Sequence, residues 1–307
     1  MNRIVLYFFL LGILSAPIQL GSAEPKPLKL KVLSSIKPIQ AIVTAIGGDY
    51  VKSDLLIPVD VSPHHYTYKP SDIRKIQKAD VVFRIDEHFE TMFNSVFENL
   101  DDTSKVVSLA ENPKIILLPI SGRHDLSHEH RSSDHDNIDT HIFTSPQNAL
   151  VMAKEIADEL SRMDVNNASK YNKNLQVFNE AMSTEIKAIK SKLEAVKDKP
   201  YIVFHNSWQY FSEYFDLQKP TVIELHEGVS AGVKSIIGIR KEISEKGIKC
   251  VFSEPGTSTK QLTFLTESFD VKIEEINVME TSFKMMPDGY ITWLSVIGSK
   301  IERCLNK

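Results

Sequence analysis

The chain has 307 residues, a formal net charge of −4 at pH 7, 42% hydrophobic and 25% charged residues, which is the composition of a globular protein long enough for two domains. This charge balance gives no reason to expect a nucleic-acid partner, and no polybasic run suggests a membrane surface. After Leu14 no apolar segment is long enough to span a bilayer.

Residues 1–23 have the features of a secretory signal peptide. A short basic start precedes an apolar run at residues 4–14, and Gly21-Ser22-Ala23 supplies the small residues of a cleavage site. An amino-terminal anchor helix is the alternative, but Pro17 ends the helical character early. No Cys near the cleavage point offers a lipid attachment site. We therefore expect export, cleavage near Ala23 and a soluble mature chain.

Strands and helices alternate from residue 24 to residue 164, which we predict as an N-terminal α/β lobe. Short apolar runs bounded by turn residues predict strands, while apolar spacings of three and four residues, or a Pro start, predict helices. The strands are expected at residues 30–36, 54–59, 79–85, 105–109 and 115–118, and the helices at 38–46, 70–78, 89–100 and 145–163.

A polar segment rich in Ser, His and Asp interrupts this lobe at residues 121–139. It has almost no apolar residues, so it cannot contribute to a core. Clustered His and carboxylate side chains indicate a weak, exchangeable metal site, and a solvated charged loop is the alternative. We expect low affinity, because ordering a flexible loop costs about 1–2 kcal/mol per residue. The candidate ligands of this secondary site are His124, His128, His130 and His135.

Residues 165–198 are predicted to form one long helix that links two lobes. Apolar residues recur at spacings of three and four from Tyr171 to Val196, and no Gly or Pro interrupts them before Pro200. Residues 199–307 then repeat the alternation, with strands expected at 201–204, 221–225, 250–253 and 271–278, and helices at 208–215, 233–246, 258–269 and 290–305.

The fold class is therefore α/β, with two doubly wound lobes joined by one long helix. In such sheets ligands bind outside the carboxyl ends of the strands, so a site in the cleft between the lobes is expected. The chain has only two cysteines, Cys250 and Cys304. An exported protein meets an oxidising compartment, so we expect a disulfide between them, with free buried thiols as the alternative.

Three histidines occupy positions where a ligand site is expected. His64 follows the second predicted strand, His205 follows the first strand of the second lobe, and His141 lies at a loop-to-helix junction. Each one alone is more often a hydrogen-bonded loop residue than a ligand. Together, three neutral imidazoles and a water complete a tetrahedral zinc site.

Several segments resemble motifs of the metal-specific solute-binding proteins of bacterial ABC importers. The order and spacing agree over essentially the whole mature chain, including the long helix. The segments are Ser62-Pro63-His64-His65-Tyr66 with Lys69-Pro70-Ser71-Asp72, His141-Ile142-Phe143-Thr144-Ser145-Pro146, Val203-Phe204-His205 with Tyr210-Phe211, and Val251-Phe252-Ser253-Glu254-Pro255.

Within that group the chain is most similar to the zinc-binding branch, the ZnuA type. Its third ligand position is His205, where manganese-binding relatives carry Glu; a His-rich loop precedes the second ligand position, and the two cysteines also match. The resemblance implies that His64, His141 and His205 bind Zn²⁺ as a transported ligand rather than a catalytic cofactor. It also implies a periplasmic location and an inner-membrane ABC permease as partner. We expect a monomer.

The fourth ligand position departs from the family pattern. Many relatives carry an Asp where this chain has Asn277, and an amide oxygen is the poorer zinc ligand, so we expect water in the fourth position. The lost negative charge also disfavours Mn²⁺. Glu254 is expected to accept a hydrogen bond from a ligating imidazole, as carboxylates near metal-bound histidines usually do.

The predicted function is capture of Zn²⁺ in the periplasm and its delivery to an ABC permease for uptake. A zinc-dependent hydrolase or hydratase with a three-His site is one alternative, and a manganese-binding member of the same group is another. A surface adhesin related to the same group is a third. No H-E-x-x-H motif or nucleophile elbow accompanies the histidines, and no dependable general acid–base partner lies beside them in sequence, which argues against an enzyme.

Overall fold

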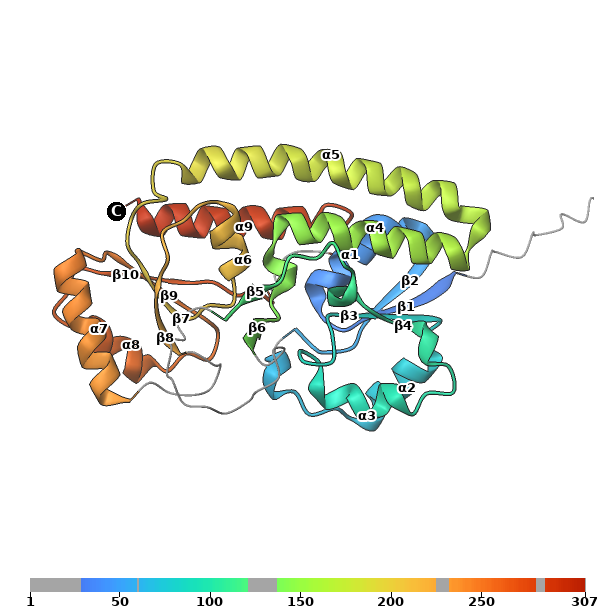
Figure 1. The fold of residues 1–307 in the computed structure, drawn as a ribbon, viewed down its shortest axis with the longest axis horizontal. Coiled ribbons are helices and arrows are strands. Elements are labelled where there is room, and N and C mark those ends of the chain that lie inside the picture. The colour runs from blue at the N-terminus through green and yellow to red at the C-terminus, as the bar shows by residue number, and fades with distance from the viewer. Residues whose placement is uncertain (1–28, 60, 121–136, 225–231, 280–284, 307) are drawn as a thin grey trace, which may run out of the picture.

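A computed structural model of the chain describes residues 29–59, 61–120, 137–224, 232–279 and 285–306. Two four-stranded parallel sheets form its two ends, and the long helix α5 (Ala168–Leu193) runs along both (Figure 1). We call the parts built on the first and second sheets the N-terminal and C-terminal lobes. The expected α/β class is confirmed. The predicted signal peptide and the four loop histidines lie outside the described residues.

The first sheet has the strand order β2-β1-β3-β4, and every pairing is parallel. Val81, Val82 and Phe83 of the inner strand β3 are completely buried, as expected for a strand covered on both faces. Helices α1 and α4 pack against each other and against α5. The elements are β1 (Leu30–Ser34), α1 (Lys37–Gly47), β2 (Val51–Leu55), α2 (Pro70–Lys78), β3 (Val81–Arg84), α3 (Asn94–Glu98), β4 (Val106–Ser108) and α4 (Pro146–Met163).

Three predicted elements of this lobe differ in the structure. Strand β2 begins and ends earlier than the predicted 54–59, because this edge strand alternates buried and exposed residues and the apolar run only starts where it ends. The predicted strand 115–118 is reduced to β5 (Leu118–Pro119), which pairs antiparallel with β6 (Ile138–Asp139) as a separate hairpin stem. The predicted helix 89–100 is shortened to a 3₁₀ turn and α3.

That last difference has a local cause. The Asp86 carboxylate accepts hydrogen bonds from the backbone N–H groups of His88 and Phe89, and this turn competes with the start of a helix. The residues Phe89, Phe93 and Phe97 still recur every four positions and are all buried. The apolar period therefore predicts the buried face correctly, while the side-chain-to-backbone bonds decide where the helix begins.

The second sheet has the order β10-β9-β7-β8, again all parallel. Helix α7 ends at Gly247, whose left-handed φ of 63° suits glycine, as the sequence predicts. The elements are β7 (Ile202–His205), α6 (Gln209–Tyr214), β8 (Thr221–Glu224), α7 (Val233–Lys246), β9 (Cys250–Ser253), α8 (Thr259–Thr266), β10 (Lys272–Glu275) and α9 (Gly289–Leu305).

The two lobes share one apolar core. A single cluster of buried residues includes Phe83 of β3, Phe178 of α5, Phe252 of β9 and Tyr290 of α9, whereas a second cluster lies entirely within the C-terminal lobe. Helix α9 packs along α5, and a Cβ at Gly298 would lie 3.1 Å from the Ile189 side chain. The lobes are thus joined by continuous packing as well as by the long helix.

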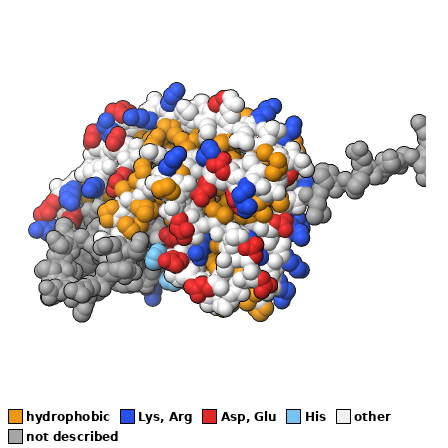
Figure 2. Space-filling model, turned by 45° about the vertical axis from the view of Figure 1, so that its right-hand side comes forward, with side chains coloured by type: hydrophobic (Ala, Val, Ile, Leu, Met, Phe, Trp, Pro, Cys, Tyr) orange, Lys and Arg blue, Asp and Glu red, His pale blue; other side chains and the backbone are white. Residues whose placement is uncertain are grey.

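Cys250 at the start of β9 and Cys304 near the end of α9 form the predicted disulfide, with their Cα atoms 5.7 Å apart. Both residues are completely buried. Across the described ranges, no helix is both long and apolar enough to cross a membrane. On the face shown in Figure 2, acidic and basic side chains are interspersed.

Candidate metal centre

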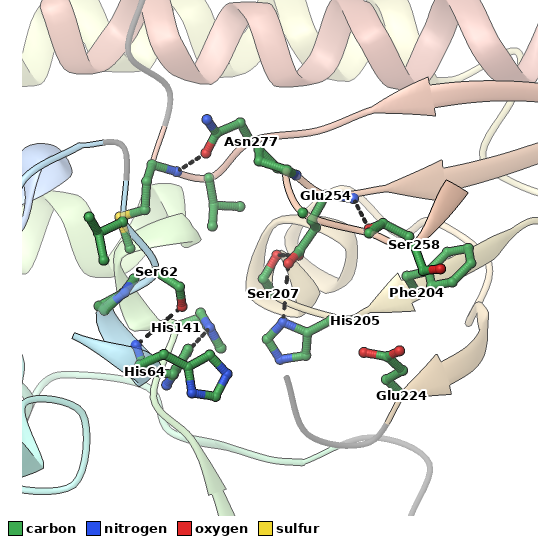
Figure 3. Close-up of a pocket in the computed structure, with 18 of the residues that line it drawn as sticks. Ser62, His64, His141, Phe204, His205, Ser207, Glu224, Glu254, Ser258 and Asn277 are labelled. Carbon is green, nitrogen blue, oxygen red and sulfur yellow. Dashed lines mark hydrogen bonds and ion pairs between the residues drawn. The ribbon is translucent and has the colours of Figure 1, made fainter. Parts of the chain in front are cut away.

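The structure brings His64, His141 and His205 together between the lobes (Figure 3). His64 lies on a 3₁₀ turn that follows β2, His141 directly precedes the 3₁₀ turn that leads into α4, and His205 ends β7. The ring centroids are 5.2 Å apart for His64 and His141, 5.0 Å for His141 and His205, and 6.1 Å for His64 and His205. Three chain segments distant in sequence thus present imidazoles to one cavity.

Two of the imidazoles already have the spacing of ligands to one ion. The Nε2 atoms of His64 and His141 are 3.2 Å apart. Zn–N bonds of about 2.0–2.1 Å place two nitrogens about 3.3–3.4 Å apart at a tetrahedral angle. Within the described residues, no group of three or more His, Cys, Asp or Glu side chains is already arranged around one ion.

A buried carboxylate orients His141. Asp139 Oδ1 lies 2.7 Å from His141 Nδ1 and also accepts the backbone N–H of His141 at 3.0 Å. Such a contact holds the proton on Nδ1 and leaves the lone pair of Nε2 for a metal. Sequence reasoning missed Asp139, although an acidic residue two positions before a candidate ligand is a readable signal.

His205 has a looser carboxylate neighbour. Glu254 Oε2 lies 3.5 Å from His205 Nδ1, and the other oxygen of Glu254 accepts a hydrogen bond from the Ser207 hydroxyl. Glu254 therefore lies beside His205, at a distance longer than that of an ordinary N–H···O hydrogen bond. Glu224, which was not among the predicted site residues, is the register partner of His205 on the neighbouring strand and lines the same cavity (Figure 3). Its position at the carboxyl end of β8 was the available signal.

His64 is held in the neutral form that binds metals. Burial, followed by the nearby His141, His205 and His65 side chains, lowers the pKa of His64 from 6.5 to about 3. The Phe89 ring packs edge-on against His64, with centroids 5.2 Å apart. At neutral pH no proton has to leave this imidazole before a metal binds.

Asn277 lines the cavity but does not join the three imidazoles. Its side-chain oxygen accepts the backbone N–H of Met279 at 2.8 Å, and Figure 3 shows the side chain away from the histidines. The cavity has a volume of about 710 Å³ and leaves ample room for water beside a bound ion.

Comparison with known proteins identifies the family. The model of the ZnuA family, described as "Zinc-uptake complex component A periplasmic", matches residues 32–304. The chain belongs to this family. ZnuA-family members are periplasmic solute-binding proteins, so the resemblance found in the sequence is confirmed. The "High-affinity zinc uptake system protein ZnuA" of Haemophilus ducreyi is 28% identical over 90% of this chain and 93% of its own. The protein of the same name from Yersinia pestis is 26% identical over 95% of this chain and 94% of its own.

Solved structures show the same ZnuA-family fold. A crystal structure of ZnuA has a TM-score of 0.74 and 23% identity, covering 90% of this chain and 99% of its own. A ZnuA deletion mutant with zinc bound has a TM-score of 0.75 and 24% identity, over 90% and 98%. The solute-binding protein FpvC of Pseudomonas aeruginosa in complex with Mn²⁺ has a TM-score of 0.76 and 19% identity, over 91% and 99%.

Proposed function

We propose that the protein captures Zn²⁺ in the periplasm with His64, His141 and His205 and delivers it to the permease of an ABC importer. The observation that carries the proposal is the His64–His141 pair at the spacing of shared zinc ligands, with His205 facing it from the other lobe. The names of the curated relatives, high-affinity zinc uptake proteins, support the same cargo.

The donor set favours zinc over harder ions. Imidazole nitrogens suit Zn²⁺ and neighbouring late metals, whereas Mn²⁺ prefers carboxylate, carbonyl and water oxygens. The oxygen of Asn277 is engaged by a backbone N–H, which supports water as the fourth ligand. A three-imidazole site with one water keeps one exchangeable position, as suits an ion that must later be released.

The proposal also includes the maturation and organisation of the chain. Residues 1–23 are removed as a signal peptide with cleavage near Ala23, and the mature protein is a monomer. Residues 24–164 and 199–307 form the two lobes, with residues 165–198 as the linking helix. The continuous core between the lobes supports a release motion of small amplitude. His124, His128, His130 and His135 form a separate, weaker metal-binding loop.

Competitive metal titration tests the proposal. We expect one tight Zn²⁺ site that excludes Mn²⁺ in the wild type and is strongly weakened in His205→Ala. His88→Ala is a matched control, because His88 is an exposed imidazole on the segment after β3 and does not line the cavity. Preference for Mn²⁺, or equal zinc affinities of the two variants, would contradict the proposal.

A binding protein has no need to turn over a substrate. The carboxylates of Asp139 and Glu254 face Nδ1 atoms of the histidines, which supports an orienting role over that of a general base. We therefore expect the zinc-loaded protein to hydrate CO₂ and hydrolyse esters no faster than the His205→Ala variant. Robust turnover that depends on His205 would favour the hydrolase alternative.

A further inference from the structure

Two tyrosine hydroxyls from the C-terminal lobe hold the segment that carries His141. Tyr210 on α6 donates a hydrogen bond to the Asp139 carbonyl at 2.5 Å, and Tyr290 at the start of α9 donates to the Phe143 carbonyl at 2.8 Å. Asp139 and Phe143 lie two residues before and two residues after His141. The backbone on both sides of this imidazole is therefore fixed to helices that follow the linking helix α5.

Tyr210 also binds the other strand of the hairpin stem. Its hydroxyl accepts the backbone N–H of Leu118 at 2.9 Å, and Leu118 is the β5 register partner of Asp139 in β6. The adjacent Gln209 donates from its side chain to the Pro119 carbonyl at 3.0 Å. One turn of α6 thus binds both strands of the stem.

The same turn of α6 follows directly after His205. His205 ends β7 and α6 begins at Gln209, so the stem with His141 is bonded to the segment that presents the third imidazole. The segment of His64 is anchored elsewhere: Tyr66 donates its hydroxyl to Asp72 of α2 at 2.7 Å, within the N-terminal lobe. The segment of His141 is therefore anchored to the segment that follows His205, whereas the segment of His64 is anchored to α2 and meets His141 through its ring.

We infer that Tyr210 is a positioning residue of the metal site, whose hydroxyl joins the stem of Asp139 and His141 to the His205 segment. His141 and His205 are then held in one hydrogen-bonded unit, and His64 is the ligand that moves away from this unit when the metal is released. The inference rests on the proposed function. Tyr210 is only 2% exposed, and burial raises the pKa of its hydroxyl, so the group stays protonated and able to donate.

The test compares Tyr210→Phe with Tyr201→Phe. Tyr201 is equally buried, directly precedes β7 and stacks on Trp208, yet no hydrogen bond joins its hydroxyl to residues 138–144 among the described residues. Zn²⁺ dissociation is followed by transfer to a chromogenic chelator. We expect dissociation about tenfold faster in Tyr210→Phe, since a buried hydrogen bond of the ligand segment is lost, and an unchanged rate in Tyr201→Phe. Equal rates in wild type and Tyr210→Phe overturn the inference.

A double-mutant cycle separates positioning from general destabilisation. If Tyr210 acts through His141, Tyr210→Phe weakens zinc binding in the wild type but adds nothing in a His141→Ala background. Additive losses would mean that the hydroxyl only stabilises the fold, and would overturn the inference. If Tyr210→Phe does not fold, Gln209→Ala replaces it in the same double-mutant cycle, because this variant removes the hydrogen bond from the Gln209 side chain to the same stem.

Hydrogen exchange of the Leu118 amide distinguishes this inference from the proposed function. We expect faster exchange in Tyr210→Phe than in Tyr201→Phe, because Leu118 loses its acceptor. If the wild type bound no zinc, the proposed function would fail and the positioning role with it, whatever the exchange rates. If the wild type bound zinc and the amide exchanged faster without any change in zinc dissociation, only the positioning role would fail.

Discussion

The substitution Asp139→Asn tests how much the orientation of one imidazole contributes to zinc affinity. The Asp139 carboxylate and the His141 ring are 2.7 Å apart, and their side chains are only 7% and 8% exposed, so water cannot readily replace a lost acceptor. An amide that turned its NH₂ group toward Nδ1 would force the imidazole proton onto Nε2, the nitrogen needed for the metal. The lost carboxylate acceptor and the shifted imidazole proton both weaken zinc binding, while the three histidine ligands remain in the chain.

Loss of such a carboxylate partner usually lowers metal affinity by about 10- to 100-fold. We expect Asp139→Asn to fall in this range, which corresponds to about 1.4–2.7 kcal/mol. Competition against a fluorescent zinc chelator measures the affinity. Asp164→Asn is the control: Asp164 accepts hydrogen bonds from Asn167 and Tyr171 at the junction of α4 and α5, away from the cavity. A folded Asp139→Asn protein whose affinity lies within twofold of the control would refute the reasoning.

Three further predictions concern acid, the disulfide and the loop. The pKa of His64 in the folded protein is lowered from 6.5 to about 3, so between these pH values the unfolded metal-free chain binds one more proton than the folded chain. The free energy of unfolding therefore decreases as the pH is lowered through this window. We expect the free energy of unfolding to be lower by roughly 3 kcal/mol at pH 4. Urea unfolding measures this difference, which should be absent in His64→Asn. Replacing Cys250 and Cys304 by Ser, which opens a 54-residue separation, should lower the free energy of unfolding by at most about 4 kcal/mol and leave zinc affinity unchanged. Deleting residues 122–136 should remove weak zinc equivalents in calorimetry but keep the tight site, because the β5–β6 stem and Asp139 lie outside the deletion.

Local patterns were enough to predict most of the secondary structure. The apolar stripe from Tyr171 to Val196 predicts α5, although the helix proper ends at Leu193. Ser145 before Pro146 marks the start of α4, and the Ser145 hydroxyl indeed accepts the Asn148 N–H at 3.1 Å. These signals succeed because helix periodicity and capping act within one or two turns of the chain.

Edge positions were harder to predict. Strand β2 carries polar residues on its exposed side, and β5 is a two-residue stem whose partner lies beyond the 121–136 segment. In both places the apolar run used for the prediction overlaps the observed strand only in part. The bounds of these strands are set by their pairing with a neighbouring strand, and the spacing of apolar residues in the sequence does not predict that pairing.

For the candidate site, the sequence by itself determined the three candidate ligands and the cargo class. Strand ends converge in a doubly wound fold, which made His64 and His205 candidates, and the resemblance of their segments and that of His141 to the zinc-binding branch completed the set and indicated the cargo. Only the tertiary structure decided what supports them. Tyr210 bonds to Asp139 across 71 residues, and Tyr290 bonds to Phe143 across 147. A hydroxyl that meets a backbone carbonyl at such separation leaves no periodic trace in the sequence, because any residue type supplies the acceptor and only the packed fold brings the two atoms together.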